Sequence, residues 1–227
     1  MSDLVQKHRK GGPVPQAIAG ASAETPDGPK KWEILDGARR VFRAEGFDGA
    51  SMDKIARAAG VSKGTLYVYF RNKEELFTEM VSVDRREAAE QLCNFDDATG
   101  DVRAVLQRVG ESFVGMMIQP DHIALIRMVM GAAEKFPEAG QLFFEMGPRC
   151  GISRLAAYLQ KQVEAGTLRI DEDIELAAAH FLNLCQGNLV KPLLFNAGEA
   201  PSREAIHKTV ASAVRLFLKS YAPAQNA

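Results

Sequence analysis

The sequence predicts an all-α protein in which a three-helix head precedes a larger helical bundle. Two observations predict this fold. From residue 31 onward, apolar residues recur at steps of three and four, the spacing of one helix face, and no stretch alternates with the period of a strand. Gly, Pro and Asn residues divide the periodic stretches into helices of ordinary length. The 227 residues suffice for one large domain or two small ones.

Residues 1–30 are rich in Gly, Pro, Ala and Ser and show no periodicity, which predicts a disordered tail. Its basic cluster at residues 7–10 could contact a phosphate backbone, although composition favours a solvated tail. Small residues follow this cluster as in a secretion signal, but Gly and Pro interrupt the apolar core that a signal requires. We expect the head over residues 31–80 and the body over residues 81–227.

The helices of the head are predicted from their caps. The first should end near Gly46, with an apolar face formed by Ile34, Leu35, Ala38, Val41 and Phe42. Ser51 is an N-cap for a short second helix, and Gly60 suits the left-handed position after it. Ser62 caps a third helix. Asn72 caps a fourth, where Glu75 completes a capping box.

The body should consist of long helices separated by Pro, Gly and polar loops. The periodic stretches are residues 102–119, 121–135, 138–165, 173–196 and 202–221. Pro148 and Pro192 fall inside two of these stretches and should kink or split them, because proline cannot donate the helical hydrogen bond.

The second and third helices form a helix-turn-helix, which can place its second helix in the major groove of DNA. Leu66 and Phe70 would hold that helix from behind. Including flanking helix N-termini, the residues expected to face DNA are Ser51, Lys63, Gly64, Thr65, Tyr67, Tyr69 and Lys73. Taken singly, each lysine could be a solvated surface charge, and Tyr69 could pack on the next helix. Their joint spacing favours a DNA-binding surface.

Charge supports this interpretation. The whole chain has a net charge of −1, with 46% hydrophobic and 25% charged residues, as in an ordinary globular protein. Residues 51–73, in contrast, contain five basic residues and one acid. A basic segment in a nearly neutral chain favours a dedicated anion-binding surface.

The stretch ILDGARRVFRAEGFDGASMDKIARAAGVSKGTLYVYFRNKEELF, residues 34–77, strongly resembles the DNA-binding domain of TetR-type transcriptional regulators. The resemblance implies a cytoplasmic homodimer that binds a palindromic operator, usually as a repressor, and a body whose small-molecule effector releases DNA. It also implies that the seven residues named above match the family's DNA-contacting positions. Residues 135–187 resemble the AefR subgroup, several of whose members control efflux or stress genes.

A dimer is also expected because one recognition helix contacts only a few base pairs, and two half-sites are needed for useful specificity. The helices expected over residues 138–165 and 173–196 carry apolar stripes that could form the interface or belong to the core. These stripes comprise Leu142, Phe143, Leu155, Leu159, Val163, Leu176, Phe181, Leu184 and Leu189.

The effector pocket is harder to predict. Methionines cluster in two helices of the body and could line a pliable apolar cavity or simply fill the core. Arg127 could bind an acidic ligand group, or it could snorkel or pair with an acid such as Glu134 or Glu145. The second alternative is favoured, because buried charges are usually paired and long side chains often snorkel. The residues expected at the pocket are Phe113, Met116, Met117, Arg127, Met130, His180 and Asn183, although His180 and Asn183 could instead form hydrogen bonds across a dimer.

Other classes of protein fit less well. We expect no enzyme, cofactor or metal, because no nucleophile elbow, phosphate loop or metal-ligand set is present. A ligand-blind DNA-binding protein would not require so large an apolar body. Cys93, Cys150 and Cys185 indicate neither a disulfide framework nor zinc, and they agree with a reducing compartment. The sequence contains no run of about 18 or more apolar residues, so we expect no membrane-spanning helix.

Overall fold

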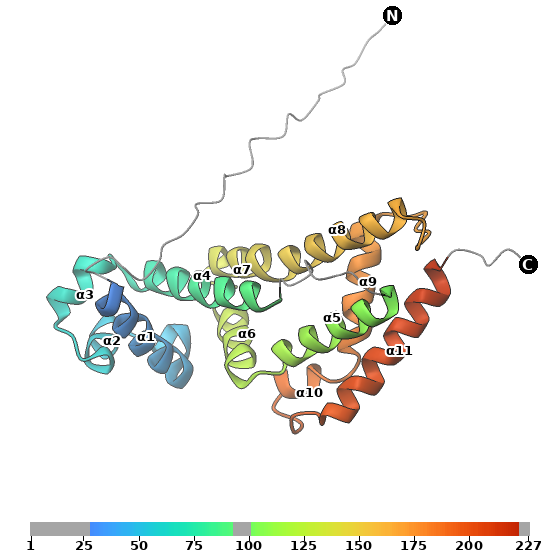
Figure 1. The fold of residues 1–227 in the computed structure, drawn as a ribbon. Helices are drawn as coiled ribbons and strands as arrows, with labels where there is room; N and C mark the ends of the chain where they lie inside the picture. The colour runs from blue at the N-terminus through green and yellow to red at the C-terminus, as the bar shows by residue number, and fades with distance from the viewer. Residues whose placement is uncertain (1–27, 93–100, 223–227) are drawn as a thin grey trace, which may run out of the picture.

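The computed structural model describes residues 28–92 and 101–222, and these residues form helices joined by turns and loops (Figure 1). The all-α prediction is confirmed. In the head and its connecting helix, the elements are α1 (Gly28–Gly49), α2 (Met52–Ala59), α3 (Lys63–Tyr69) and α4 (Lys73–Leu92). In the body they are α5 (Val102–Met117), α6 (Pro120–Ala132), α7 (Pro137–Phe144), η1 (Glu145–Arg149), α8 (Cys150–Glu164), α9 (Ile174–Gln186), α10 (Lys191–Leu194) and α11 (Arg203–Tyr221).

Local signals define the helix-turn-helix as predicted. Gly46 interrupts α1 with φ 70° and ψ 176°, a conformation that glycine adopts without steric cost. Ser51 accepts a hydrogen bond from the backbone N–H of Lys54 at the start of α2. Gly60 then ends α2 in the left-handed conformation with φ 68°, and Ser62 caps α3. The two helices are thereby joined by a tight turn.

The N-terminus of α4 differs slightly from the predicted capping box. The Asn72 side chain accepts from the backbone N–H of Glu75 at 2.8 Å, as expected. The Glu75 carboxylate, however, accepts from the backbone N–H of Arg71 at 2.8 Å, one residue before the cap. This contact ties the end of α3 to the first turn of α4.

Both predicted helices that contain an internal proline are divided, but only the first is divided at its proline. Pro148 lies in η1, a five-residue π-helical turn that separates α7 from α8. Pro192 lies in α10, which follows the end of α9 at Gly187. The stretches expected over residues 138–165 and 173–196 are therefore each interrupted rather than continuous.

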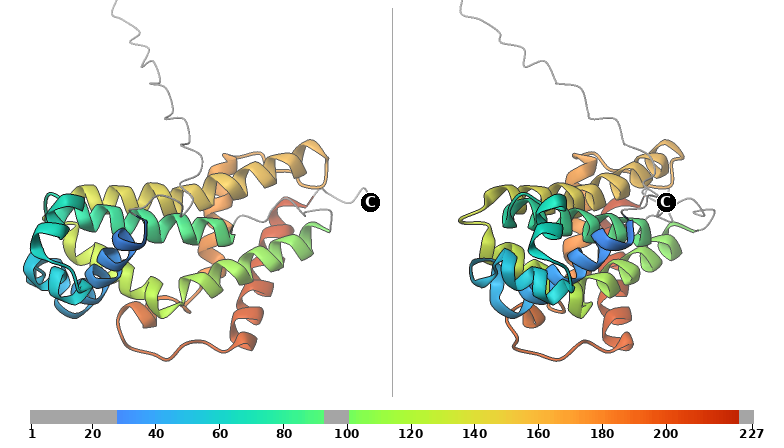
Figure 2. Two further views of the ribbon diagram at one scale, coloured as in Figure 1. Left: turned by 60° about the vertical axis from the view of Figure 1, so that its left-hand side comes forward. Right: turned by 90° about the vertical axis from the view of Figure 1, so that its left-hand side faces the viewer.

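Two hydrophobic cores organise the molecule. The first joins buried residues of α1 to α4 with the inner faces of α6 and α7. The second joins α5, α8, α9 and α11. Figure 2 shows the head at one end and α11 at the other, with α4 running from the head alongside α7 and α8. Helix α4 contributes to the core of the head and also packs on α7, so it connects the head to the body.

Some expectations concern residues outside the described ranges. Most of the predicted tail, its basic cluster and Cys93 lie there. The first helix begins at Gly28, slightly before the expected start of the head. Among the described helices, none has both the length and the apolar character needed to cross a membrane.

Candidate nucleic-acid interface and ligand cavity

Helix α3 is held from behind and exposed in front. Leu66 is completely buried and Phe70 nearly so, and both belong to the first core. On the opposite side, Tyr67 is 45% exposed and Val68 is 82% exposed. Large side chains left in solvent on a short helix at the end of the molecule form a surface suited to a partner.

Lys63 and Gly64 shape the N-terminal end of this surface. The Lys63 ammonium lies 2.7 Å from the Asp53 carboxylate on α2, and this hydrogen bond raises the pKa of Lys63. Both side chains are more than half exposed, so the pair is a surface ion pair that an incoming phosphate can displace. A Cβ at Gly64 would meet only the Ser62 hydroxyl, at 3.8 Å. Packing within the chain therefore does not require glycine there.

The hydroxyl residues near the helix starts form local caps. The Ser62 hydroxyl accepts from the Thr65 backbone N–H at 3.0 Å and lies 2.7 Å from the Thr65 hydroxyl. Ser51 caps α2 in the same manner, at 3.4 Å from the backbone N–H of Lys54. These caps place the N-terminal turns of α2 and α3 at the surface of the head.

Tyr69 and Lys73 are more engaged with the protein than the sequence suggested. Tyr69 is half-buried and packs on the first core. Lys73 donates to the backbone oxygens of Phe47 at 2.8 Å and Ala50 at 3.3 Å, and its ammonium lies 4.4 Å from the centre of the Phe47 ring. Lys73 therefore joins α4 to the end of α1.

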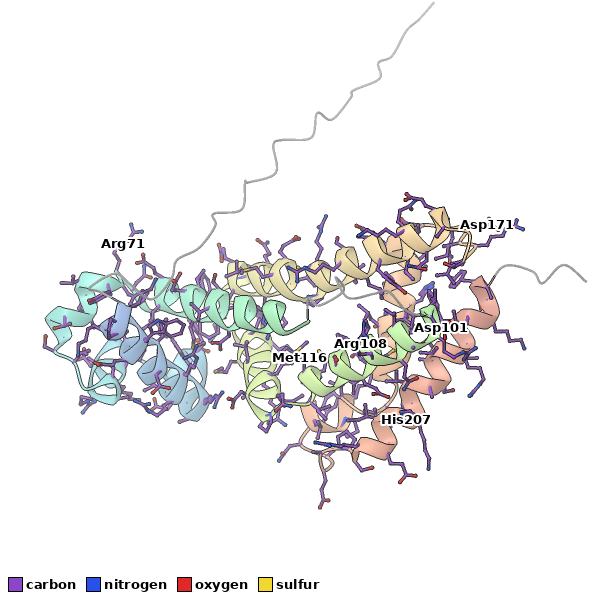
Figure 3. All side chains as sticks on the ribbon, viewed as in Figure 1. Arg71, Asp101, Arg108, Met116, Asp171 and His207 are labelled. Carbon is purple, nitrogen blue, oxygen red and sulfur yellow. The ribbon has the colours of Figure 1, made fainter. Side chains whose placement is uncertain are left out.

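Arg71 lies between α3 and α4 at the outer edge of the head, and Figure 3 shows its side chain projecting away from the ribbon. Its guanidinium is 3.2 Å from the Glu75 carboxylate, and the side chain is 88% exposed. It is a further basic group at the end of the molecule that carries α3.

A cavity of about 170 Å³ lies in the body. Its lining comes from α4, α5, α6, α7, η1, α8 and α9: Arg85, Val109, Phe113, Met116, Met117, His122, Ile126, Phe143, Met146, Gly147, Pro148, Cys150, Gly151, Ile152, Arg154, Leu155, Ala179, Leu182, Asn183 and Gln186. Apolar side chains predominate, with a few polar groups, which is typical of small-molecule sites. Figure 3 labels Met116 on α5, near the centre of the molecule.

Four of the predicted pocket residues line this cavity: Phe113, Met116, Met117 and Asn183. The other three do not. Arg127 donates to the backbone oxygens of Leu193 and Leu194, so it holds α10 against α6, and it pairs with no carboxylate of the described residues. Met130 is 68% exposed on α6, and His180 lies in an open hollow between α9 and α11.

The sequence interpretation missed the two most buried polar residues of the cavity. Arg85 on α4 is 4% exposed and His122 on α6 is 7% exposed. The Arg85 Nη2 lies 2.6 Å from His122 Nδ1. Because arginine can only donate, Nδ1 accepts and the histidine proton is on Nε2. A sequence signal existed, since Arg85 follows Phe77 and Val81 at helical steps of four.

Burial determines the charge of this pair. Burial and the Arg85 charge lower the pKa of His122 to about 4, so the ring is neutral near pH 7. Burial lowers the pKa of Arg85 to about 10, against the opposing effect of Asp84, and the guanidinium stays cationic. The Asp84 carboxylate itself is held by Arg39 on α1, with Nε at 2.9 Å.

The two cysteines among the described residues occupy different environments. Cys185 is fully buried against α5 and α11, and burial raises the pKa of its thiol to about 12, so it is not a ready nucleophile. Cys150 lines the cavity. Within residues 28–92 and 101–222, no group of three or more His, Cys, Asp or Glu residues could hold a metal ion.

The apolar stripes of the body separate into core and surface. Leu155, Leu159 and Phe181 are buried in the second core, so they are not free to form an interface. Leu176 and Leu184 on α9 are exposed, as is Leu216 on α11. The exposed apolar face therefore includes part of the stripe expected over residues 173–196, on α9, and it continues onto α11, which was not expected to contribute.

Two family matches cover the regions just described. Residues 34–80 match the bacterial regulatory proteins of the tetR family. Residues 104–223, more than half of the chain, match the C-terminal domain of AefR-like transcriptional repressors. The chain belongs to the TetR family. As a member of this family it is a transcriptional regulator with a helix-turn-helix DNA-binding domain, which confirms the resemblance seen in the sequence.

Solved and curated regulators are similar to this chain over most of their length. A TetR-family regulator from Mesorhizobium loti has a TM-score of 0.80 and 25% identity, covering 88% of this chain and 100% of that one. The flavonoid-responsive regulator FrrA has a TM-score of 0.76 and 31% identity, covering 87% of this chain and 100% of that one. The regulator YfiR of Bacillus subtilis is 23% identical over 188 residues, which is 83% of this chain and 89% of YfiR.

Proposed function

We propose that this TetR-family protein is a dimeric repressor that binds a palindromic operator and is released from it by a small molecule. The observation that carries the proposal is the geometry of α3. Buried Leu66 and Phe70 anchor the helix, while Tyr67 and Val68 stand in solvent beside Lys63. A short helix of this kind fits the major groove, where its N-terminal residues contact base edges and phosphates.

The proposed DNA contacts follow from this geometry. Lys63, Thr65 and Tyr67 lie on or near the outer side of α3, and Gly64 leaves room for close approach. Ser51 and Tyr69 flank that surface on α2 and at the end of α3. Lys73 is the exception, because its ammonium already serves two carbonyl oxygens of the α1 end.

The exposed face of α9 and α11 is the proposed dimer interface. Leu184 and Leu216 border two shallow hollows on this face, together with polar residues such as His180, Lys208 and Ser212. Exposed leucines beside polar groups are typical of an interface whose centre is apolar and whose rim is polar. A dimer formed there would hold two heads at a fixed spacing for two half-sites.

The cavity is the proposed effector site. It is lined by the helix that also builds the head, since Phe77 and Arg85 lie two turns apart on α4. A ligand that shifts α4 can therefore change the position of the head. The names of relatives such as FrrA, a flavonoid-responsive regulator, support control by a small molecule.

The DNA-binding proposal is tested by selecting bound DNA from random oligonucleotides and measuring affinity for the selected site by gel shift. Tyr67→Ala and Lys63→Ala should each weaken binding by about 5-fold or more, since each removes a side chain that we expect to contact DNA. Lys161→Ala, which removes an exposed lysine of α8, is the matched control. Wild-type affinity in both α3 variants, with folding intact by circular dichroism, would contradict the contact assignment.

The interface proposal is tested separately by light scattering. Leu184→Glu combined with Leu216→Glu should convert a dimer to a monomer, because it buries two charges in the proposed interface. The matched control is Met130→Glu, on the exposed side of α6. A double variant that stays dimeric would place the interface elsewhere.

A further inference from the structure

The cavity contains one buried cation with an unused hydrogen-bond donor. The Arg85 side chain is almost completely buried, and its Nη2 donates to His122. Its Nε–H is buried and has no hydrogen-bond partner within the described part of the chain. An unpaired buried guanidinium donor costs free energy, so its retention in a cavity indicates a partner other than the described residues.

The surroundings of Arg85 favour a negatively charged partner. The cavity lining includes two arginines, Arg85 and Arg154, and no aspartate or glutamate. The nearest acid in sequence, Asp84, is bound to Arg39 on α1. His122 accepts one N–H and brings no negative charge. The guanidinium therefore has no carboxylate partner among these groups.

The rest of the lining favours an apolar body on the same ligand. Phe113, Met116, Met117 and Phe143 surround the space, and the Arg85 guanidinium carbon lies 4.6 Å from the centre of the Phe143 ring. Methionine side chains adapt to irregular apolar shapes. A space of about 170 Å³ exceeds the engineered cavity of about 150 Å³ that binds benzene, so a small ring or short chain fits inside.

Gly147 leaves room for the guanidinium. This residue lies in the π-helical turn η1, and a Cβ added to it would come within 3.2 Å of Arg85 Nη1. The turn η1, which contains Pro148, thus places a backbone without a side chain against the cation. Arg85 is positioned between η1, His122 and Phe143 rather than left free to extend to solvent.

From these contacts we infer that the effector is a small amphipathic carboxylate, whose anionic group pairs with Arg85 while its apolar body fills the methionine- and phenylalanine-lined cavity. A planar carboxylate suits the fork of a guanidinium, and one negative charge matches one buried cation. Because Arg85 lies on α4, the anion contacts the connecting helix directly. The inference rests on the proposed effector role of the cavity.

The test uses matched probes that share a body and differ in head group. Octanoate, 1-octanol and octylamine form one series; 3-phenylpropionate, 3-phenylpropanol and 3-phenylpropylamine form the second. Binding to the full chain is measured by calorimetry near neutral pH in the absence of DNA. The carboxylates should bind at least about 10-fold more tightly than the alcohols and the amines, because a charge-assisted hydrogen bond contributes at least that factor.

Variants assign the effect to Arg85. Arg85→Met, of similar length and apolar, should lose about 10-fold or more in carboxylate affinity and leave alcohol affinity nearly unchanged. Arg85→Lys keeps the charge without the planar guanidinium, so its carboxylate affinity should lie between those of wild type and Arg85→Met. Arg154→Met removes an equal charge from the cavity lining and should have the smaller effect. Thermal unfolding of each variant checks the fold, and Arg85→Lys carries the test if Arg85→Met does not fold.

Three results would overturn the inference: alcohols or amines binding as tightly as carboxylates, equal losses in the Arg85 and Arg154 variants, or no saturable binding of either carboxylate. Operator release is then measured by gel shift. Carboxylates that bind through Arg85 without releasing DNA would leave the head-group assignment standing and remove the effector role. Release of DNA by neutral compounds alone would support the effector role of the cavity and contradict the carboxylate head group.

Discussion

At the scale of single residues, two lysines that look equivalent in the sequence have different roles in the structure. Lys63 forms an exposed ion pair with Asp53, whereas Lys73 is half-buried and donates to two backbone oxygens. Exposed pairs exchange partners at little cost, and buried donors do not. Only Lys63 is therefore poised to move to a phosphate.

Removing the competing carboxylate of Lys63 should strengthen DNA binding. Asp53→Asn frees the Lys63 ammonium and removes a negative charge beside the phosphates. Because an exposed ion pair contributes little free energy, operator affinity should rise by no more than about 5-fold in a gel shift at low salt. Asp171→Asn breaks a comparable exposed pair with Arg169 at the far end of the body and should change nothing (Figure 3). Weaker binding by Asp53→Asn would contradict this role.

Replacing Lys73 should affect stability more than DNA binding. Lys73→Ala removes two hydrogen bonds and the contact with the Phe47 ring, which together should cost about 1–3 kcal/mol in the free energy of unfolding. The slope of log affinity against log salt should stay at the wild-type value, whereas Lys63→Ala should flatten it by about 1. A flattened slope in Lys73→Ala with unchanged stability would make Lys73 a phosphate contact instead.

At the scale of elements, the helix ends of the head were predictable because they depend on local chemistry. Ser51, Gly60 and Ser62 act on their own turns, and the structure confirms each cap. Pro148 likewise lies where its helix is interrupted, because proline has no N–H to donate, whereas Gly187 ends α9 before Pro192 is reached. These signals need no knowledge of neighbouring helices.

Which face of a body helix points inward was less predictable. Phe113, Met116 and Met117 share one side of α5 and were correctly grouped. Helix α6 is apolar on most sides, so the sequence did not show that His122 and Ile126 face the cavity while Met130 faces solvent. That choice is made by the helices packed around α6. Arg85 was not predicted to be buried, because arginine side chains usually lie at the surface even on an apolar helix face.

The crossing of α1 and α2 depends on a glycine, which gives a test of element packing. A Cβ at Gly37 would lie 2.6 Å from the Ala59 backbone nitrogen, which cannot move aside. Gly37→Ala should therefore destabilise the protein by about 1–3 kcal/mol in urea unfolding. At Gly115 on α5, a Cβ would meet nothing within 4 Å. Gly115→Ala should stabilise by up to about 1 kcal/mol, and equal effects at the two sites would contradict the close crossing.

At the scale of the whole molecule, α4 is the element that joins recognition to sensing. Its first turns complete the core of the head, and Arg85 further along reaches the cavity. The buried Arg85–His122 pair therefore links α4 to α6, which itself packs on the head. The protonation state of this pair should influence the stability of the entire fold.

The free energy of unfolding should fall as the pH falls from about 6.5 toward about 4, and His122 should account for much of that loss. The folded protein holds the pKa of His122 at about 4, against 6.5 for an unperturbed histidine. Between these values the unfolded chain binds a proton that the folded protein does not, so acid favours unfolding. From about pH 7 to about pH 5 the loss should be about 2 kcal/mol.

Urea unfolding of wild type and His122→Gln at one protein concentration measures this contribution, because glutamine can still accept from Arg85 without titrating. The carboxylates with lowered pKa, Asp48, Glu75 and Glu111, act in the same direction but below their ordinary values of 3.8 to 4.5, and both proteins share them. The difference between the two curves should therefore open above pH 5. Parallel curves over that range would mean that His122 is not held neutral inside the fold.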